Sequence, residues 1–293
     1  MKFKIISTLA IFFTTFLVIG SQFPLFSQEV GTVEVKKSRL YVGLSGGYFQ
    51  NQITNETSMS LPGIKYTTSN SFSGSGEIGY FFSNYFGLSS GIGYSPYQSE
   101  VTLDAYQIKF NTVDSENETY ERRITGSNIK EVQKIDFFTV PICVNFRLPF
   151  SKAVGLFLQT GVNLALPVKK SYSSSGTFSY KGYYPAYNLL LENLPQYGFQ
   201  DNVATAYEGR LDLKPVNVFG TASVGLDFLV QEKFQIAVAG SFCKSLSNIS
   251  RYSPSGEFRL SSDINQMKSF MEGSNKVSAQ SVGINISFRF FLE

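Results

Sequence analysis

Histidine and tryptophan are absent from this chain of 293 residues, and charged residues make up only 16% of it. Without histidine, the chain cannot carry a Ser-His-Asp triad, a histidine-ligated metal or an imidazole acid–base. The charged fraction lies well below the roughly 25% that soluble domains carry. The formal net charge of +3 is too small to indicate binding to nucleic acid or to an anionic membrane surface.

Long hydrophobic runs are also scarce, which excludes a helical protein with several membrane spans. The one long run lies at the N-terminus, where Lys2 and Lys4 precede apolar residues over 5–19. This order, with a possible cleavage site before Gln28, is typical of a secretory signal peptide at residues 1–27. A retained membrane anchor is the alternative, although the run is short for a span.

Alternation of apolar and polar residues with a period of two dominates the rest of the chain. In residues 281–290 the apolar side chains share one parity, while Ser, Gly, Asn and Arg occupy the other. Successive side chains of a strand point to opposite faces, so this pattern predicts a strand with one apolar and one polar face. The same pattern, or a weaker glycine-rich form of it, predicts eight strands near residues 39–48, 70–82, 85–97, 136–148, 154–166, 216–228, 234–242 and 281–290.

The connections between these segments alternate in length. Short turns at 83–84, 149–153 and 231–233 alternate with long loops at 49–69, 98–133, 169–213 and 247–275. Short turns on one side and long loops on the other are typical of outer-membrane barrels. We therefore expect an all-β fold over residues 39–291, an eight-stranded antiparallel transmembrane β-barrel with long extracellular loops, preceded by a short periplasmic segment at 28–38. A soluble lipocalin-like barrel, with its apolar face inward, is the alternative.

Two further features favour the membrane. The polar face is rich in small residues and short of Lys and Glu, which suits a narrow interior better than a surface in water. Aromatic residues gather at strand ends, where an interfacial girdle would lie. They are Tyr80, Phe81, Phe82, Tyr85, Phe86, Phe290 and Phe291.

Four segments carry a resemblance to a known family. They are Asp-Phe-Phe-Thr-Val-Pro-Ile at 136–142, the glycine-rich stretch at 88–94, Thr-Gly-Val-Asn at 160–163 and Phe-Arg-Phe-Phe at 288–291. With them the chain resembles the small outer-membrane β-barrel proteins of Gram-negative bacteria, including PorT-like and OmpA-type members. The resemblance implies the outer membrane as location, its lipid as a partner, and assembly machinery that reads the C-terminal strand. Leu292 and Glu293 follow the terminal aromatic Phe291, which departs from the family's pattern.

Four charged residues form the clearest constellation on the polar parity. Glu77, Arg147, Asp227 and Arg289 each lie a few residues from a short turn, so we expect them to meet at one height inside the barrel. Their charges sum to zero, and an eight-stranded barrel is just wide enough for side chains to fill it. Such buried charges must pair. The cluster is either a structural plug or a gate that opens a pore when the pairs rearrange.

Glycine and cysteine patterns give weaker signals. Residues 74–79 match a dinucleotide-binding Gly-x-Gly-x-x-Gly pattern, but no helix follows, so we interpret these glycines as easing the curvature of a small barrel. Cys143 and Cys243 share the polar parity, which suggests a disulfide in an oxidising compartment. Their distances from the short turns differ, however, and place them at different heights. We therefore expect two free thiols, with the disulfide as the alternative.

The loop at 169–213 is long and rich in tyrosine. A structureless loop of this length is uncommon, so we expect part of it to extend the flanking strands as a hairpin above the membrane, with a short helix possible at 188–194. If that hairpin entered the membrane, the barrel would have ten strands. The tyrosines form a candidate recognition surface, or else a self-packed cap. The candidates are Tyr172, Tyr180, Tyr183, Tyr184, Tyr187 and Tyr197, with Tyr207 in the same loop.

The charged run in the loop at 98–133 is interpreted as a solvated face; it comprises Glu116, Glu118, Glu121, Arg122 and Arg123. Because acyl transfer by serine needs a base and no histidine is present, we expect no enzyme, and we expect no cofactor. The leading hypothesis is a barrel whose extracellular loops bind a partner or stiffen the envelope. A narrow channel or a subunit of a secretion or transport assembly is the alternative, and a soluble lipocalin-like binder is the third.

Overall fold

The structure is a computed structural model, and it describes residues 40–57, 63–151, 153–230, 233–253 and 258–292. The predicted signal peptide at 1–27 and the predicted periplasmic segment at 28–38 therefore lie outside the described residues. In these residues helix is confined to two short 3₁₀ turns, Pro185–Tyr187 and Pro195–Tyr197. No helix in the described part of the chain is long and apolar enough to cross a membrane.

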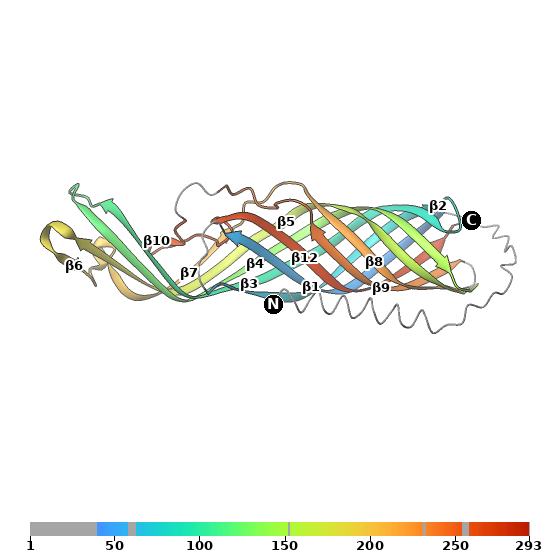
Figure 1. Cartoon of the computed structure of the whole chain (residues 1–293), viewed down its shortest axis with the longest axis horizontal. Helices are drawn as coiled ribbons and strands as arrows, with labels where there is room; N and C mark the ends of the chain where they lie inside the picture. The colour runs from blue at the N-terminus through green and yellow to red at the C-terminus, as the bar shows by residue number, and fades with distance from the viewer. Residues whose placement is uncertain (1–39, 58–62, 152, 231–232, 254–257, 293) are drawn as a thin grey trace. The chain divides into compact units, whose positions relative to one another are not determined.

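Eight antiparallel strands close into a ring (Figure 1). Each strand pairs with its neighbours in chain order, and the last pairs with the first, so the ring has no open edge. A walk along paired residues that starts at Val42 returns to the first strand at Gln52, a stagger of ten residues (52 − 42) that gives the strands their tilt. The strands of the ring are β1 (Leu40–Thr57), β2 (Lys65–Phe81), β3 (Phe86–Val113), β4 (Thr119–Pro149), β5 (Val154–Tyr184), β8 (Asn217–Val230), β9 (Phe234–Ser245) and β12 (Ser274–Phe291). The prediction of eight strands is confirmed.

Two of the predicted long loops are wrong, because the strands continue through them. β3 and β4 run as one long hairpin through the segment expected to be a loop at 98–133, and only a short turn joins them. β1 and β2 likewise extend into the predicted loop at 49–69. In the turn between β3 and β4, the Asp114 carboxylate accepts the N–H groups of Glu116 and Glu118 at 2.9 and 3.0 Å.

The loop at 169–213 does extend as a hairpin, as predicted. β5 continues to Tyr184, and β7 (Gln200–Arg210) pairs with it outside the ring. The short helix expected at 188–194 is wrong, because β6 (Leu189–Leu191) lies there and pairs with the end of β5. In the described residues β7 pairs only with β5, so this hairpin adds no ninth or tenth strand to the ring.

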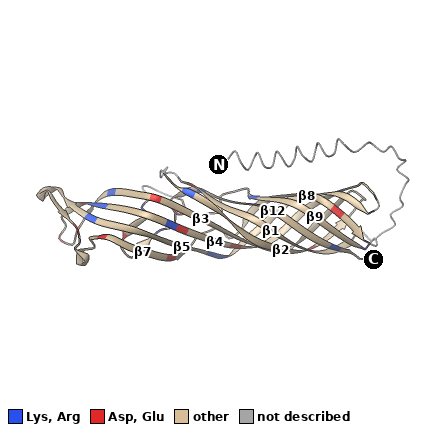
Figure 2. Cartoon of the chain, turned by 90° about the horizontal axis from the view of Figure 1, so that it is seen from below, with Lys and Arg blue, Asp and Glu red and all other residues tan. Residues whose placement is uncertain are grey.

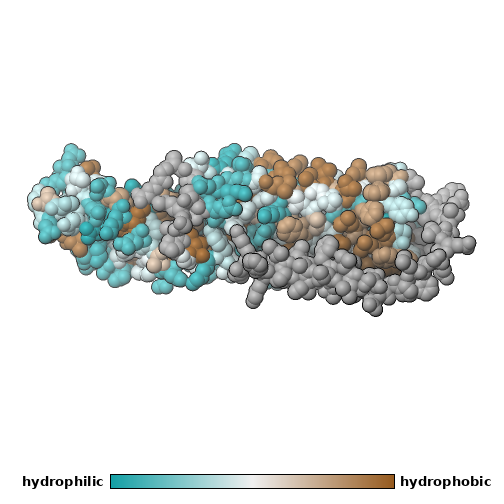
Figure 3. Space-filling view, in the orientation of Figure 1, coloured by the Kyte–Doolittle hydropathy of each residue, from teal (hydrophilic) through white to brown (hydrophobic). Residues whose placement is uncertain are grey.

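The ring exposes an apolar band on its outer face. Figure 3 shows brown surface over this part of the molecule, and Figure 2 shows few charged residues on the ring wall. This is the opposite of the soluble lipocalin-like alternative, which would turn the apolar face inward. The band includes Val42, Leu44, Ile78, Leu88, Ile92, Ile142, Val144, Leu158, Leu226, Phe228, Val238, Ile284, Ile286 and Phe288, all exposed.

The predicted aromatic girdle is only partly correct. Tyr80, Phe82, Tyr85, Phe86 and Phe290 are exposed at the short-turn end of the band, where a girdle would lie. Phe81 instead points inward and is buried. Its ring lies against the rings of Tyr41 and Phe291, with which it forms an aromatic cluster inside the end of the barrel.

Beyond the band, β3, β4, β5 and β7 continue as an extracellular sheet with a core of its own. There the apolar side chains point inward and the outer face is polar. The segment with the small hairpin of β10 (Ser261–Asp263) and β11 (Gln266–Met267) folds against that inner face. The core contains Val101, Leu103, Tyr106, Ile108, Ile124, Ile129, Phe178, Tyr180, Leu260, Met267 and Phe270.

Candidate functional site

The four charged residues singled out in the sequence meet inside the barrel as two ion pairs. Arg289 on β12 places Nε 2.7 Å from a carboxylate oxygen of Glu77 on β2. Arg147 on β4 places Nε 2.5 Å from Asp227 on β8. Arg289 and Asp227 are almost completely buried. Because a lone buried charge is costly, each pair depends on both of its members.

A glycine beside each pair explains how such large side chains fit. Gly43 lies in register between Glu77 and Arg289 on the two neighbouring strands. Gly155 lies opposite Asp227, and a Cβ atom there would be 2.5 Å from the Asp227 carboxylate and 3.1 Å from a backbone oxygen. The two pairs therefore depend on the absence of a side chain at these positions.

Amide side chains join the ion pairs into one network. Asn145 donates to the hydroxyls of Ser89 and Tyr41 at 2.9 and 3.2 Å. Gln159 donates to the Asn145 carbonyl oxygen at 3.0 Å, and Gln235 donates to the Asp227 carboxylate. The Arg289 guanidinium also lies over the rings of Phe157 and Tyr41, 4.4 and 5.0 Å from their centroids. This network fills the barrel near its short-turn end.

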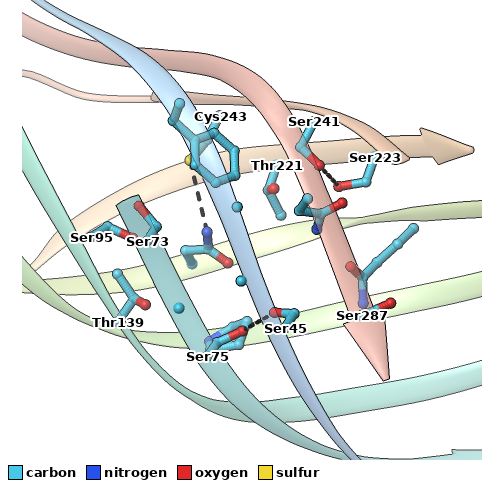
Figure 4. A pocket seen from close by; sticks show the side chains of 18 of the residues that line it. Ser45, Ser73, Ser75, Ser95, Thr139, Thr221, Ser223, Ser241, Cys243 and Ser287 are labelled. Atoms are coloured by element: carbon cyan, nitrogen blue, oxygen red, sulfur yellow. Dashed lines mark hydrogen bonds between the residues drawn. The ribbon is translucent and has the colours of Figure 1, made fainter. Parts of the chain in front are cut away.

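A polar cavity of about 130 Å³ lies between this network and the other end of the barrel. Figure 4 shows it lined largely by serine and threonine hydroxyls from neighbouring strands. Pairs of these hydroxyls bond across strands, as Ser45 does with Ser75 and Ser241 with Ser223. The volume suffices for several water molecules.

An aromatic layer closes the barrel on the extracellular side of this cavity. The rings of Tyr97, Phe137 and Phe219 contact one another at centroid distances of 5.3–5.9 Å. All three are buried and belong to a core cluster that also contains Ile53, Ile135 and Met271. Within the described residues, side chains thus fill the interior at two levels, the charged network and this apolar layer.

The candidate tyrosine surface is wrong for three of its six members, which pack inside the extracellular sheet as the alternative of a self-packed cap predicts. Tyr172, Tyr180 and Tyr184 are buried, since the long strands turn them towards the core. Tyr183 is partly covered by the Arg123 guanidinium, 4.3 Å from its ring centroid. Only Tyr187 and Tyr197 remain strongly exposed, at 61% and 65%.

These two tyrosines lie at the 3₁₀ turns that end the hairpin of β5 and β7. Beneath them, Tyr120 stacks on Tyr184 at 5.1 Å and contacts Phe199 edge-on at 5.7 Å. The Tyr187 hydroxyl donates to Glu118 at 2.7 Å, which raises the pKa of that phenol. The tip of the hairpin is therefore a packed structure and not a loose loop.

The interpretation of the charged run at 116–123 as a solvated loop face is correct for Glu116 and Glu118, which lie in the turn before β4, and wrong for the other three residues. Glu121, Arg122 and Arg123 lie on β4, because the hairpin continues past them. Arg123 pairs with Glu121 at 2.5 Å. Arg122 is half-buried between the rings of Tyr180 and Phe199.

Cys143 and Cys243 are free thiols, as predicted. Asn163 donates to the Cys243 sulfur at 3.8 Å, and both cysteines line the polar cavity. Residues 74–79 lie within β2, whose glycines pair with β1 and β3, so no helix opens there as dinucleotide binding would need. The described residues contain no group of three or more Cys, Asp and Glu side chains that could hold a metal ion.

Several residues of the interior were not identified from the sequence. Three of them lie on the same strand face and at the same height as the charged cluster, so the alternation pattern could have identified them; they are Asn145, Gln159 and Gln235. The sequence could not identify Gly43 and Gly155, because these strands contain many glycines. Only the register of the paired strands shows which two lie beside the ion pairs. Glu131, a fully buried carboxylate of the extracellular sheet, was hidden within the predicted loop at 98–133.

Comparisons with known proteins agree with this architecture. The model of a family described as outer membrane protein beta-barrel domain matches residues 26–251. Among solved structures, the chain is similar to Neisserial surface protein A, at 9% identity over 86% of this chain and 97% of that one, with a TM-score of 0.36. It is also similar to OprG from Pseudomonas aeruginosa (12% identity, 87% and 98% covered, TM-score 0.33) and to Ail from Yersinia pestis (10%, 87% and 99%, 0.26). No curated protein matches the chain.

Proposed function

The chain belongs to the family of outer membrane β-barrel proteins, and from that premise we propose that it is a non-enzymatic, closed barrel that holds a rigid extracellular platform for binding a partner. Export by a signal peptide at residues 1–27 and membrane insertion through the C-terminal strand belong to the same proposal. The barrel supplies the anchor in outer-membrane lipid, through its apolar band.

The observation that carries the proposal is the extracellular sheet with its own core. β3, β4 and β5 have 28, 31 and 31 residues, whereas about ten residues suffice to cross a membrane. A chain that only had to seal a barrel would not need strands three times that length. Fully buried Ile124, Phe178 and Tyr180 pack the strands of the projecting part into a core. Preorganised surfaces of this kind lose little conformational entropy when they bind.

The tip of the platform is the expected contact surface. Tyr187 and Tyr197 are exposed there on a packed base, and tyrosine is enriched in recognition surfaces. The test is chemical crosslinking on intact cells, followed by purification of the barrel. A partner in stoichiometric amount should be recovered with the native chain and lost with Tyr187→Ala/Tyr197→Ala. The control, Asn111→Ala at an exposed position of β3, should retain it. Equal recovery of the partner with all three chains would contradict the role of the tip.

A channel is the second candidate, favoured by the polar cavity inside the ring. The charged network and the aromatic layer interrupt that path, so purified protein in planar bilayers should show negligible conductance. Arg147→Ala removes one ion pair but leaves Tyr97, Phe137 and Phe219 in place, and its conductance should stay negligible too. Discrete channel openings by the native protein would establish the channel and refute the closed barrel.

A further inference from the structure

A segment between β9 and β12 crosses the inner face of the extracellular sheet. Residues 260–273, called the strap here, include β10 and β11 and bury Leu260, Met267, Phe270 and Met271 completely. Met267 and Phe270 enter the core of the sheet, and Met271 enters the apolar cluster above the polar cavity. The strap therefore bridges the two apolar clusters of the molecule.

The strap is attached to the strands by side chains and not by a backbone ladder. The Leu260 N–H donates to the Tyr106 hydroxyl at 3.1 Å. The Tyr172 hydroxyl donates to the Met267 carbonyl oxygen at 3.1 Å, and the Tyr180 hydroxyl donates to that of Asp263 at 3.2 Å. Among the described residues, the one backbone–backbone hydrogen bond between the strap and a strand of the ring is at the strap's own end, where the Ser274 N–H of β12 donates to the Met271 carbonyl oxygen at 3.2 Å. Detachment would thus leave every barrel ladder intact.

Glu131 of β4 is the strongest of these attachments. One carboxylate oxygen accepts the Ser269 hydroxyl at 2.7 Å and the Gln133 amide at 2.6 Å. The other accepts the Ser174 hydroxyl at 2.9 Å and the Phe270 N–H at 3.1 Å. Two of the four donors belong to the strap. Glu131 is completely buried, yet within the described chain it has no cationic partner.

The groups around Glu131 supply no positive charge. Tyr66 of β2, Tyr172 of β5 and Tyr252 before the strap face it, and all three are neutral near pH 7. Glu272 of the strap is a second acid, with Lys268 as the nearest cation that influences it. On β4 itself, exposed Lys130 pairs with Glu100 on the opposite face of the sheet. Burial raises the pKa of the Glu131 carboxyl, and burial also raises that of Glu272.

We propose that residues 260–273 form a detachable strap whose closure over the extracellular sheet is controlled by the protonation of Glu131. In the closed state the Glu131 carboxyl is buried away from water, and in the open state water surrounds it. A carboxyl with a raised pKa holds its proton more tightly when closed than when open. Closure is therefore strongest at pH values below the ordinary pKa of a carboxyl group. It weakens as the pH rises through the raised pKa of the closed state. The open state is therefore more populated in alkaline surroundings than in acid ones.

Hydrogen exchange of the full-length protein in lipid nanodiscs tests this between pH 5.5 and 8.5. The protection of the Phe270 and Met271 amides, corrected for intrinsic exchange rates, should fall as the pH rises. The fall should be about tenfold for each unit by which the pKa of Glu131 in the closed state exceeds its pKa in the open state, within the pH range measured. Glu131→Gln removes the fully buried titrating group at nearly constant shape and should remove most of the pH dependence of this protection, leaving the part that Glu272 contributes. Glu121→Gln, on the same strand but paired outside with Arg123, should behave like the native protein.

Two further variants keep the outcome interpretable. Ser269→Ala removes one donor to the carboxylate, so it should lower strap protection at pH 8.5 more than at pH 5.5. Glu272→Gln should keep most of the native pH dependence, because the fully buried Glu131 is still present. Amides of Ile142 and Val144 on the ring wall report whether each variant has folded. The proposal is overturned if strap protection in the native protein does not change with pH, or if folded Glu131→Gln retains the native dependence.

Discussion

The ring and the extracellular sheet are built from the same strands but are inverted with respect to each other. On β4, exposed Ile142 and Val144 point outward in the ring, while the interior positions are polar. Further along the same strand, Ile124, Ile129 and Ile135 point inward and are fully buried. The change occurs between two adjacent residues: the side chain of Phe138 is exposed on the outer face, and that of Phe137 is buried on the inner face.

The inversion follows from the surroundings on the two sides of the wall. In the ring, lipid takes the outer face, and a narrow interior is filled with polar networks. Beyond the ring, water takes the outer face, so the inner face must supply a hydrophobic core. The change coincides with a register shift between β4 and β5 at Asp136 and Phe137, where Val168 is the extra residue of β5. The extra residue shifts the inward positions of β5, from odd-numbered Ala165 to even-numbered Tyr172. On β4 the inward positions stay odd-numbered across this point, and they change from polar residues such as Asn145 to apolar ones such as Phe137.

The largest expected effect concerns the polar interior of the ring. Asp227→Ala removes the partner of Arg147 and of Gln235, and leaves a largely buried guanidinium without its carboxylate. Breaking a buried pair in this way costs about 3–5 kcal/mol of the free energy of unfolding. Urea titration in lipid vesicles, read by heat-modifiable gel migration, measures it. A loss below about 1 kcal/mol would mean that water reaches the pair and that the ring interior is not dry.

The next effect tests the outer face. Ile142→Arg puts a charge at an exposed position within the apolar band. A charge facing lipid near the membrane centre costs about 2–4 kcal/mol. Ser173→Arg is the matched control, because it adds the same residue to the outer face of β5 beyond the band, where that face is in water. Both variants are measured by the same urea titration. Similar losses for the two would refute the assignment of lipid and water to these two zones.

A smaller effect tests how tightly the ring interior is filled. Gly155→Ala would bring a methyl group against the Asp227 carboxylate and a backbone oxygen of Leu148. Overpacking of this kind costs about 1–3 kcal/mol. Gly240→Ala is the control, since its added Cβ atom would meet only one atom, at an ordinary 3.9 Å. If the two alanine variants unfold at the same urea concentration, the space beside Asp227 is not constrained.

The sequence predicted the ring better than the extracellular sheet, for a physical reason. In the ring, alternation between lipid and interior is regular, and it located all eight strands and the parity of Glu77, Arg147, Asp227 and Arg289. Beyond the band, Lys130, Glu131 and Asn128 resemble loop residues, although they lie on β4. Asn128 has a left-handed backbone (φ 52°) at a register irregularity, which shifts the alternation and hides the strand. The three buried tyrosines were misassigned for the same reason, since their burial depends on strands that were not foreseen.

The smallest expected effect separates charges in water from charges inside the ring. Lys65 and Asp104 pair at 2.9 Å on the extracellular part, but both side chains are about two-thirds exposed or more. Solvent screens such a pair, and ordering two long side chains offsets most of its attraction. Asp104→Ala should therefore leave the urea midpoint unchanged within error, although the substitution is the same as Asp227→Ala. Raising the salt concentration should also leave that midpoint unchanged. If Asp104→Ala proved as damaging as Asp227→Ala, the difference between the regions would not lie in burial, and the extracellular sheet would depend on its surface charges.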